Sequence, residues 1–270
     1  MEVPHILKMW YVRDVMKRIM LVVAYDGTKY CGWQIQPNGI TIEEVLNKAL
    51  SELLKEPITV IGASRTDSGV HALGNVAIFD TDTRIPGDKI SYALNQRLPE
   101  DVVIRESKEV DADFHPRRCV STKTYCYRIM NSRFPVPTER LYSYFVYYPL
   151  KEALMTEAAS YLVGEHDFKS FCSTGSQVTD TTRTIYDIKV ERTEEAITIR
   201  IKGNGFLYNM VRIIAGTLIK VGLGAIPAAE VREILLKKDR SYAGPKAPAQ
   251  GLTLEKIEYS NKSIDTPGEI

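Results

Sequence analysis

A short polar loop near residue 65 carries the residue types that a catalytic site needs. The loop lies in the segment Ala63–His71, between two apolar stretches with the composition of strands. A rigid scaffold can present a loop carboxylate such as Asp67 to a substrate, where it acts as a nucleophile or as a general base. The alternative interpretation is a surface ion pair between Arg65 and Asp67, since such pairs are common and weak. The loop alone does not decide between the two.

A second candidate is Arg212, which stands in the apolar stretch Gly205–Gly216. This stretch predicts a helix from about Phe206 to Val221 that is apolar on nearly every face and is therefore buried. A buried guanidinium stays ionised and needs a carboxylate or phosphate close by. We expect Tyr208 on the same helical face as Arg212. In the alternative interpretation, the aliphatic part of Arg212 packs in the core while its head group reaches water.

A basic segment, His115–Arg128, combines cations with aromatic residues. It contains Arg117, Arg118, Lys123 and Arg128 and no acidic residue. Tyr125 and Tyr127 alternate on the predicted strand, so both face the same side and offer flat surfaces for unstacked bases, while the cations suit phosphates. A half-buried strand with aromatic core residues and a solvated basic edge explains the pattern equally well.

The composition is that of an ordinary globular protein. Among the 270 residues, 44% are hydrophobic and 26% are charged, and the formal net charge is +1. Such a chain has no global basic field, so an RNA-binding surface must come from local clustering of Lys and Arg.

The sequence predicts no metal site, no cofactor and no membrane span. The four cysteines form no close pair, the four histidines have no zinc-binding spacing, and no apolar run approaches about 20 residues. The first residues lack the order of a signal peptide, so we expect a cytoplasmic protein with reduced thiols.

The first half of the chain predicts the order β-α-β-β-α-β. Thr41 and Glu44 form a capping box before a helix whose apolar residues run from Ile42 to Leu54. We treat residues 1–18 as an N-terminal extension and residues 19–118 as the first half. Its strands are predicted at 20–25, 58–61, 75–80 and 102–110, and its second helix at 89–98.

The second half, residues 119–270, repeats this order. Its strands are predicted at 122–130, on both sides of the turn Thr193–Ala196, and at 252–259; its helices are predicted at 152–162 and 206–221, with an inserted helix at 228–237. Split β-α-β units of this type give an α+β protein with an antiparallel sheet and helices on one face. Two such halves side by side would leave the opposite face of the sheet to line a cleft.

Taken together, the motifs resemble the TruA family of tRNA pseudouridine synthases. Eight motifs occur in the family's order between about Met20 and Tyr259, and such a series is highly specific. They are YDGT (25–28), GWQ (32–34), GASRTDSGVHA (62–72), FHPR (114–117), KTYCY (123–127), GEHDF (164–168), GNGFLYNMVR (203–212) and APAQGL (247–252). The departures are small: Ser64 where the family usually has Gly, and Ser68 where Ala is common.

The resemblance implies a fold, a reaction and a role for each site residue. The implied fold has two ferredoxin-like halves that form one extended, mainly antiparallel sheet with a central RNA-binding cleft, in a homodimer. The implied substrate is tRNA, at uridines 38, 39 and 40 of the anticodon stem-loop. Asp67 matches the catalytic nucleophile, Arg65 the arginine that helps to flip the nucleotide, Tyr125 the tyrosine that stacks on the base, and Arg212 the arginine that pairs with the aspartate.

Pseudouridine forms when uracil leaves C1′ of its ribose, turns and rejoins through C5, which requires neither redox nor metal chemistry. Asp67 would attack C1′ or remove a proton from C2′, and the sequence leaves both routes open. The alternatives are a synthase that modifies other RNA targets and a non-catalytic RNA-binding protein. A carboxylate-dependent hydrolase is less well supported, because it normally needs a second acidic group.

Overall fold

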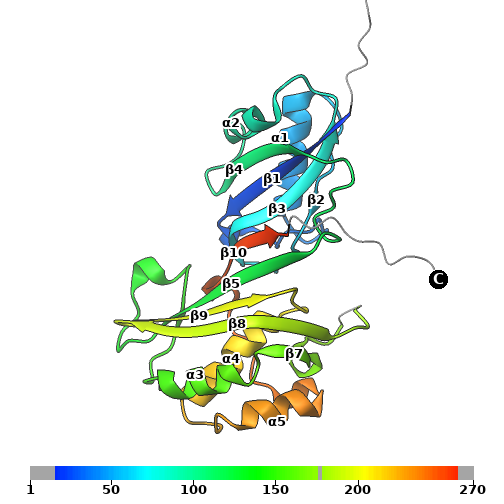
Figure 1. Ribbon diagram of the computed structural model, residues 1–270. Helices are drawn as coiled ribbons and strands as arrows, with labels where there is room; N and C mark the ends of the chain where they lie inside the picture. Colours follow the sequence, from blue (N-terminus) through cyan, green and yellow to red (C-terminus); the bar gives the residue numbers. More distant parts are fainter. Residues whose placement is uncertain (1–15, 176–177, 261–270) are drawn as a thin grey trace, which may run out of the picture.

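The computed structural model describes residues 16–175 and 178–260, and in this part of the chain ten strands form one sheet (Figure 1). The first half has the predicted order of elements. They are β1 (Lys17–Tyr25), α1 (Ile42–Leu54), β2 (Ile61–Gly62), β3 (His71–Thr81), α2 (Ile90–Asn95) and β4 (Val102–Val110).

The second half contains the predicted elements and two short strands, β6 and β7, that the sequence analysis missed. The elements are β5 (Ser121–Met130), β6 (Tyr144–Phe145), α3 (Glu152–Ser160), β7 (Gly164–Asp167), β8 (Thr182–Thr193), β9 (Ala196–Gly203), α4 (Met210–Gly222), α5 (Glu230–Lys237) and β10 (Leu252–Tyr259).

The pairing of the strands confirms two ferredoxin-like halves in one α+β sheet. The main path of the sheet is β4-β1-β3-β10-β5-β9-β8-β7, with β2 on β3 and β6 on β5. In the first half, β1 lies between β4 and β3, and β2 pairs with β3. In the second half, β5 lies in the same way between β10 and β9, and β8 pairs with β9. All these pairs are antiparallel. The halves join where β10 runs parallel to β3, with Thr253 opposite His71 and Leu254 opposite Ala72.

The helices of both halves cover the same face of this sheet (Figure 1). Alternate residues of β1, such as Leu21, are fully buried together with Leu46 of α1. At the junction, Ala72 and Leu254 lie opposite each other and belong to the same core as the α4 residue Ile213. One continuous hydrophobic core therefore runs beneath all the helices and fixes the two halves as a unit.

Helix α1 begins and ends as its sequence predicts. The Thr41 hydroxyl accepts a hydrogen bond from the Glu44 backbone N–H at 3.3 Å, which satisfies one of the free donors of the first turn. The helix ends with Lys55 in the left-handed conformation, at φ 62°. The cap and the apolar periodicity agree, which explains why this helix was predictable.

Several boundaries differ from the prediction, each for a local reason. Strand β1 begins at Lys17, inside the proposed extension, whose residues 1–15 lie outside the described part. Strand β2 is shorter than 58–61, because Ile58 and Val60 donate their backbone N–H groups to Ser51 and Asn47 of α1. The helix predicted at 89–98 covers only Ile90–Asn95 and follows a 3₁₀ turn at Gly87–Lys89.

Helix α4 begins at Met210, four residues later than predicted, because Asn209 adopts a left-handed conformation with φ 59°. Tyr208 therefore precedes the helix and does not share a helical face with Arg212. Farther along, α4 packs against the segment 243–247 with almost no space between them. The Gly244 backbone N–H donates to the Thr217 hydroxyl at 2.9 Å, and the Ala247 N–H donates to the Arg212 carbonyl at 3.1 Å.

We expect Gly216→Ala to destabilise the protein, although alanine favours a helix by about 1 kcal/mol over glycine. A Cβ at position 216 would lie 1.8 Å from the carbonyl oxygen of Pro245, which is backbone and cannot simply rotate away. Overpacking costs about 1–3 kcal/mol or more, so the free energy of unfolding measured in urea should fall.

Gly222→Ala is the matched control in the same helix. The nearest atoms there belong to the side chains of Met155 and Leu150, which can adjust. Two variants of equal stability would contradict the close backbone packing at Gly216.

Candidate active site

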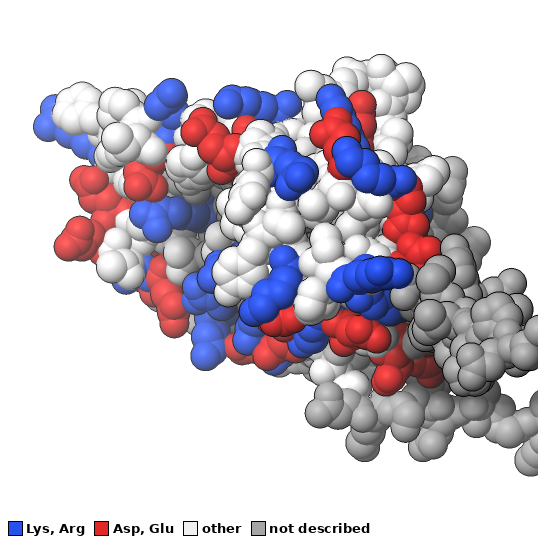
Figure 2. Space-filling model, turned by 90° about the horizontal axis from the view of Figure 1, so that it is seen from above, with Lys and Arg blue, Asp and Glu red and all other residues white. Residues whose placement is uncertain are grey.

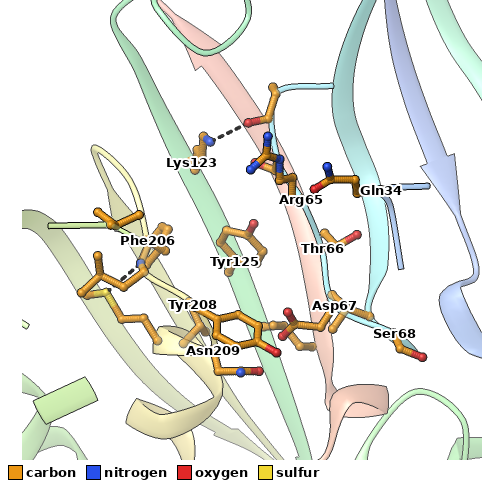
Figure 3. A pocket seen from close by; sticks show the side chains of 18 of the residues that line it. Gln34, Arg65, Thr66, Asp67, Ser68, Lys123, Tyr125, Phe206, Tyr208 and Asn209 are labelled. Atoms are coloured by element: carbon orange, nitrogen blue, oxygen red, sulfur yellow. Dashed lines mark hydrogen bonds between the residues drawn. The ribbon is translucent and has the colours of Figure 1, made fainter. Parts of the chain in front are cut away.

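A pocket of about 840 Å³ lies where the two halves of the sheet meet (Figure 3). Its walls come from the loop after β2, from β5 and from the loop before α4, with residues 34–36 at one side. The β5 residues that line it, Lys123 and Tyr125, are on the same face of their strand as Tyr127 and Ile129, which pack in the core beneath the helices. The pocket therefore lies on the helix-bearing face, and not on the opposite face where we expected the site.

The loop that carries Asp67 is held by buried hydrogen bonds. The hydroxyl groups of Tyr25 and Thr66 lie 2.7 Å apart, and the Trp33 backbone N–H donates to the Thr66 carbonyl at 3.0 Å. Asn75 accepts from the Ser64 N–H at 3.2 Å and donates to the Ser64 carbonyl at 3.0 Å. These contacts hold both sides of the loop, so the Asp67 side chain is presented by a rigid backbone.

Arg212 meets Asp67, as the sequence analysis expected. Its Nη1 lies 3.2 Å from the Oδ2 of Asp67 and donates at 3.0 Å to the Oδ1 of Asn209, while its Nε donates at 2.8 Å to the Ala247 carbonyl. Arg212 is only 8% exposed and does not line the pocket. The guanidinium thus approaches Asp67 from behind the wall and leaves the space in front of the carboxylate open.

Aromatic side chains form the wall beside the carboxylate. Tyr125 is 9% exposed, and its ring packs edge-on against Phe206 with 5.1 Å between the centroids. Burial raises the pKa of Tyr125 to about 12, so its phenol stays protonated near neutral pH. Tyr208, which is 51% exposed, adds a third ring, next to Asp67 and Asn209 (Figure 3).

Two residues of the basic segment do not have the positions that we expected. Tyr127 is fully buried, and its hydroxyl donates to the Pro248 carbonyl at 2.8 Å, so it has no free face for a base. Arg128 forms an ion pair with Glu139 at 3.1 Å, although no acidic residue is near it in the sequence. Strand alternation placed Tyr127 on the correct face, but its depth depends on the long-range packing of residues 247–252.

Arg117 and Lys123 of this segment lie at the pocket together with Arg65, whereas Arg118 is exposed and does not line it. Arg65 is exposed at its rim, and Lys123 lines it, with Nζ donating to the Ala63 carbonyl at 3.1 Å. Arg117 donates from Nε to the Gly62 carbonyl at 2.7 Å. Burial, with a contribution from Arg117 and Arg183, lowers the pKa of Lys123 to about 8.

The structure adds residues that sequence reasoning missed. Asn209 and the Ala247 carbonyl share the Arg212 guanidinium, and Gln34, Thr66 and Phe206 line the pocket beside the named residues. The only signal for them was their membership of the motifs, since neither periodicity nor charge distinguishes an amide or a backbone carbonyl.

Within residues 16–175 and 178–260, no three His, Cys, Asp or Glu side chains gather as metal ligands would. No helix described in these ranges is long and apolar enough to cross a membrane.

The family model described as tRNA pseudouridine synthase matches residues 21–117 and 158–260, which include Asp67 and Arg212. The tRNA pseudouridine synthase A of Thermoanaerobacter sp. (strain X514) is 52% identical over 244 residues, which are 90% of this chain and 100% of the relative. The proteins of that name from Acetivibrio thermocellus and Brevibacillus brevis are 49% and 48% identical, with the same coverage. Because the family model spans both halves of the sheet and the relatives align along their whole length, this chain belongs to the tRNA pseudouridine synthase family.

Proposed function

We propose that this protein converts uridine to pseudouridine in tRNA, with Asp67 as the catalytic nucleophile. The observation that carries the proposal is the position of the Asp67 carboxylate. It faces a pocket beside an aromatic ring, and it is held from behind by the buried Arg212. A protein that only bound RNA would gain nothing from a carboxylate placed where it repels phosphates.

The isomerisation needs one glycosidic bond broken and one formed. The N1–C1′ bond breaks, the uracil turns within the pocket, and a C5–C1′ bond forms; C5 then loses its proton, and N1 gains one. In one route Asp67 attacks C1′ and is released when C5 attacks in turn. In the other route it removes the C2′ proton as uracil leaves, which gives a glycal, and it returns the proton to C2′ as C5 bonds to C1′.

The remaining residues have supporting roles. A duplex or stacked loop must release the uridine into the pocket at the cost of a few kcal/mol of unstacking. Arg65, exposed at the rim, would occupy the space that the base leaves. Tyr125 would hold the base by its face, and Arg212 would keep the carboxylate oriented toward the ribose.

The proposed targets are uridines 38, 39 and 40 in the anticodon stem-loop, and the proposed assembly is a cytoplasmic homodimer. These points rest on the resemblance to the TruA family. We also propose a division into halves at residues 118 and 119, between the two segments that match the family model. Mapping pseudouridine in the tRNA of cells that lack the gene would identify the positions.

Asp67→Asn should abolish the reaction, because the amide is neither a nucleophile nor a base but has nearly the same shape. We expect the release of tritium from tRNA carrying 5-tritiated uridine to fall by about 10⁴-fold or more, with tRNA affinity nearly unchanged. Asp187→Asn, at an exposed position on β8, is the control and should retain full activity. Turnover by the Asp67 variant would refute the assignment.

Arg212→Lys tests whether orientation matters as well as charge. Lysine keeps a cation but cannot reach Ala247, Asn209 and Asp67 together. We expect kcat of this variant to fall about 10²-fold with little change in KM. For Arg212→Met we expect a larger fall in kcat and an altered pH profile of kcat. Wild-type rates and an unchanged pH profile in both variants would exclude the pairing from catalysis.

Tyr125→Phe and Tyr125→Leu separate the aromatic face from the hydroxyl group. Phenylalanine keeps a ring against Phe206, whereas leucine does not. Stacking on a base contributes about 1–3 kcal/mol, or roughly 5- to 150-fold, so the Leu variant should lose that much in kcat/KM relative to the Phe variant. Equal values for the two variants would show that stacking is the wrong role.

A further inference from the structure

Cations at the pocket differ from the ion-paired cations elsewhere in the molecule. On the face drawn in Figure 2, Lys and Arg lie next to Asp and Glu. Many of the described cations form ion pairs, as Arg18 does with Asp80, Lys202 with Glu258 and Arg200 with both Glu191 and Glu255. Within residues 16–175 and 178–260, no such ion pair involves Arg117, Lys123 or Arg183, and the hydrogen bonds of these side chains end on backbone carbonyls.

These cations come from separate elements: Arg117 and Lys123 line the pocket, and Arg183 lies next to it. Lys123 on β5 and Arg117 on the segment before it bond to the neighbouring carbonyls of Ala63 and Gly62. Arg183 on β8 donates to the carbonyls of Asp180 and Thr182. Its Cδ and Nε lie 3.6 Å from the point that a Cβ atom on residue 205 would occupy. Gly205 directly precedes the pocket residue Phe206.

The electrostatics show that the cluster is short of negative charge. Arg117 and Arg183 both contribute to the lowered pKa of Lys123, after burial. Burial and then Arg65 lower the pKa of Arg117. Glu43 acts in the opposite direction on the pKa of Arg117, and Arg183, after the hydrogen bonds from Thr182, contributes to the lowered pKa of Asp180, but neither carboxylate forms an ion pair with these arginines. Like charges held together in this way cost free energy, which a bound anion would offset.

We propose that Arg117, Lys123 and Arg183 bind neighbouring backbone phosphates of the substrate RNA next to the flipped nucleotide. This phosphate-binding site adds detail to the proposed function and rests on it. Three separate cations along a rim suit a chain of phosphates better than one small anion. The rings of Tyr125 and Phe206 lie at the same pocket and offer stacking surfaces for the bases of the same nucleotides.

The salt dependence of RNA binding tests this proposal. Each phosphate contact contributes about 0.7 to the slope of log K against log salt for single strands and about 0.9 for duplexes. Arg183→Gln should lower the slope for an anticodon stem-loop RNA by that amount, and Lys123→Met by a similar amount. Arg183 is the sharper probe, because its carbonyl partners lie on its own segment, so its replacement breaks no hydrogen bond between distant segments.

Two control variants make the result specific. Arg183→Lys retains the charge and should retain the wild-type slope. Arg232→Gln removes an exposed cation from α5, which lies at the outer end of the second half (Figure 1), and should not change the slope. An unchanged slope in both Arg183→Gln and Lys123→Met, with thermal unfolding intact, would overturn the proposal.

The protonation of Lys123 gives a second readout. The charged and titratable groups that line the same pocket are Cys31, Arg65, Asp67, Arg117, Tyr125 and Tyr208, with Arg183 nearby. A phosphate would raise the pKa of Lys123 from about 8, so binding is strongest below that pH and weakens as the pH rises through it. We expect affinity to fall up to about tenfold from pH 7 to 9, and Lys123→Met to remove most of this fall.

The binding and activity assays distinguish this proposal from the proposed function. A protein that shows the slope change but never forms pseudouridine would contradict the activity and leave the phosphate site supported. A protein that forms pseudouridine with the same slope in every variant would contradict the phosphate site alone.

Discussion

The ion pair between Asp67 and Arg212 is the constraint on which the centre of this structure depends. A guanidinium that is 8% exposed must have its donors satisfied, and its partners come from the loop after β2, from Asn209 and from Ala247. Moving any of these segments would leave a buried donor or acceptor without its partner. The geometry at the carboxylate is therefore determined by both halves of the sheet together, and neither half alone contains the site.

The path of the chain makes this convergence possible. Because β10 lies between β3 and β5, the segment leading into it must pass under α4, where Gly216 and Gly244 allow the backbones to touch. The same segment supplies the carbonyl groups that bind Arg212 and Tyr127. The small residues and prolines before the last strand thus have a packing role that connects the junction of the sheet to the site.

Local signals predicted those parts of the molecule whose structure is decided locally. The cap and periodicity of α1, the alternation in β5 and the meeting of Arg212 with a carboxylate follow from neighbouring residues and from the cost of burying charge. The short β2, the late start of α4 at Asn209 and the pairing of Arg128 with Glu139 follow from contacts between distant segments. The face of the sheet that carries the pocket was missed for the same reason, since alternation gives the two faces of a strand but not which face a distant loop will cover.

The distribution of charge at the pocket resolves a conflict in the proposed reaction. The proposed reaction places a carboxylate beside the ribose, but a bare negative charge there would repel the phosphates on either side of the nucleotide. Arg212 balances Asp67 from behind the wall, so the compensating charge takes no space from the substrate. The attraction for RNA then has to come from other cations, and those at the rim lack carboxylate ion pairs within the described residues. A chain with a net charge of +1 can in this way be strongly positive where RNA must enter and neutral where the bond must break.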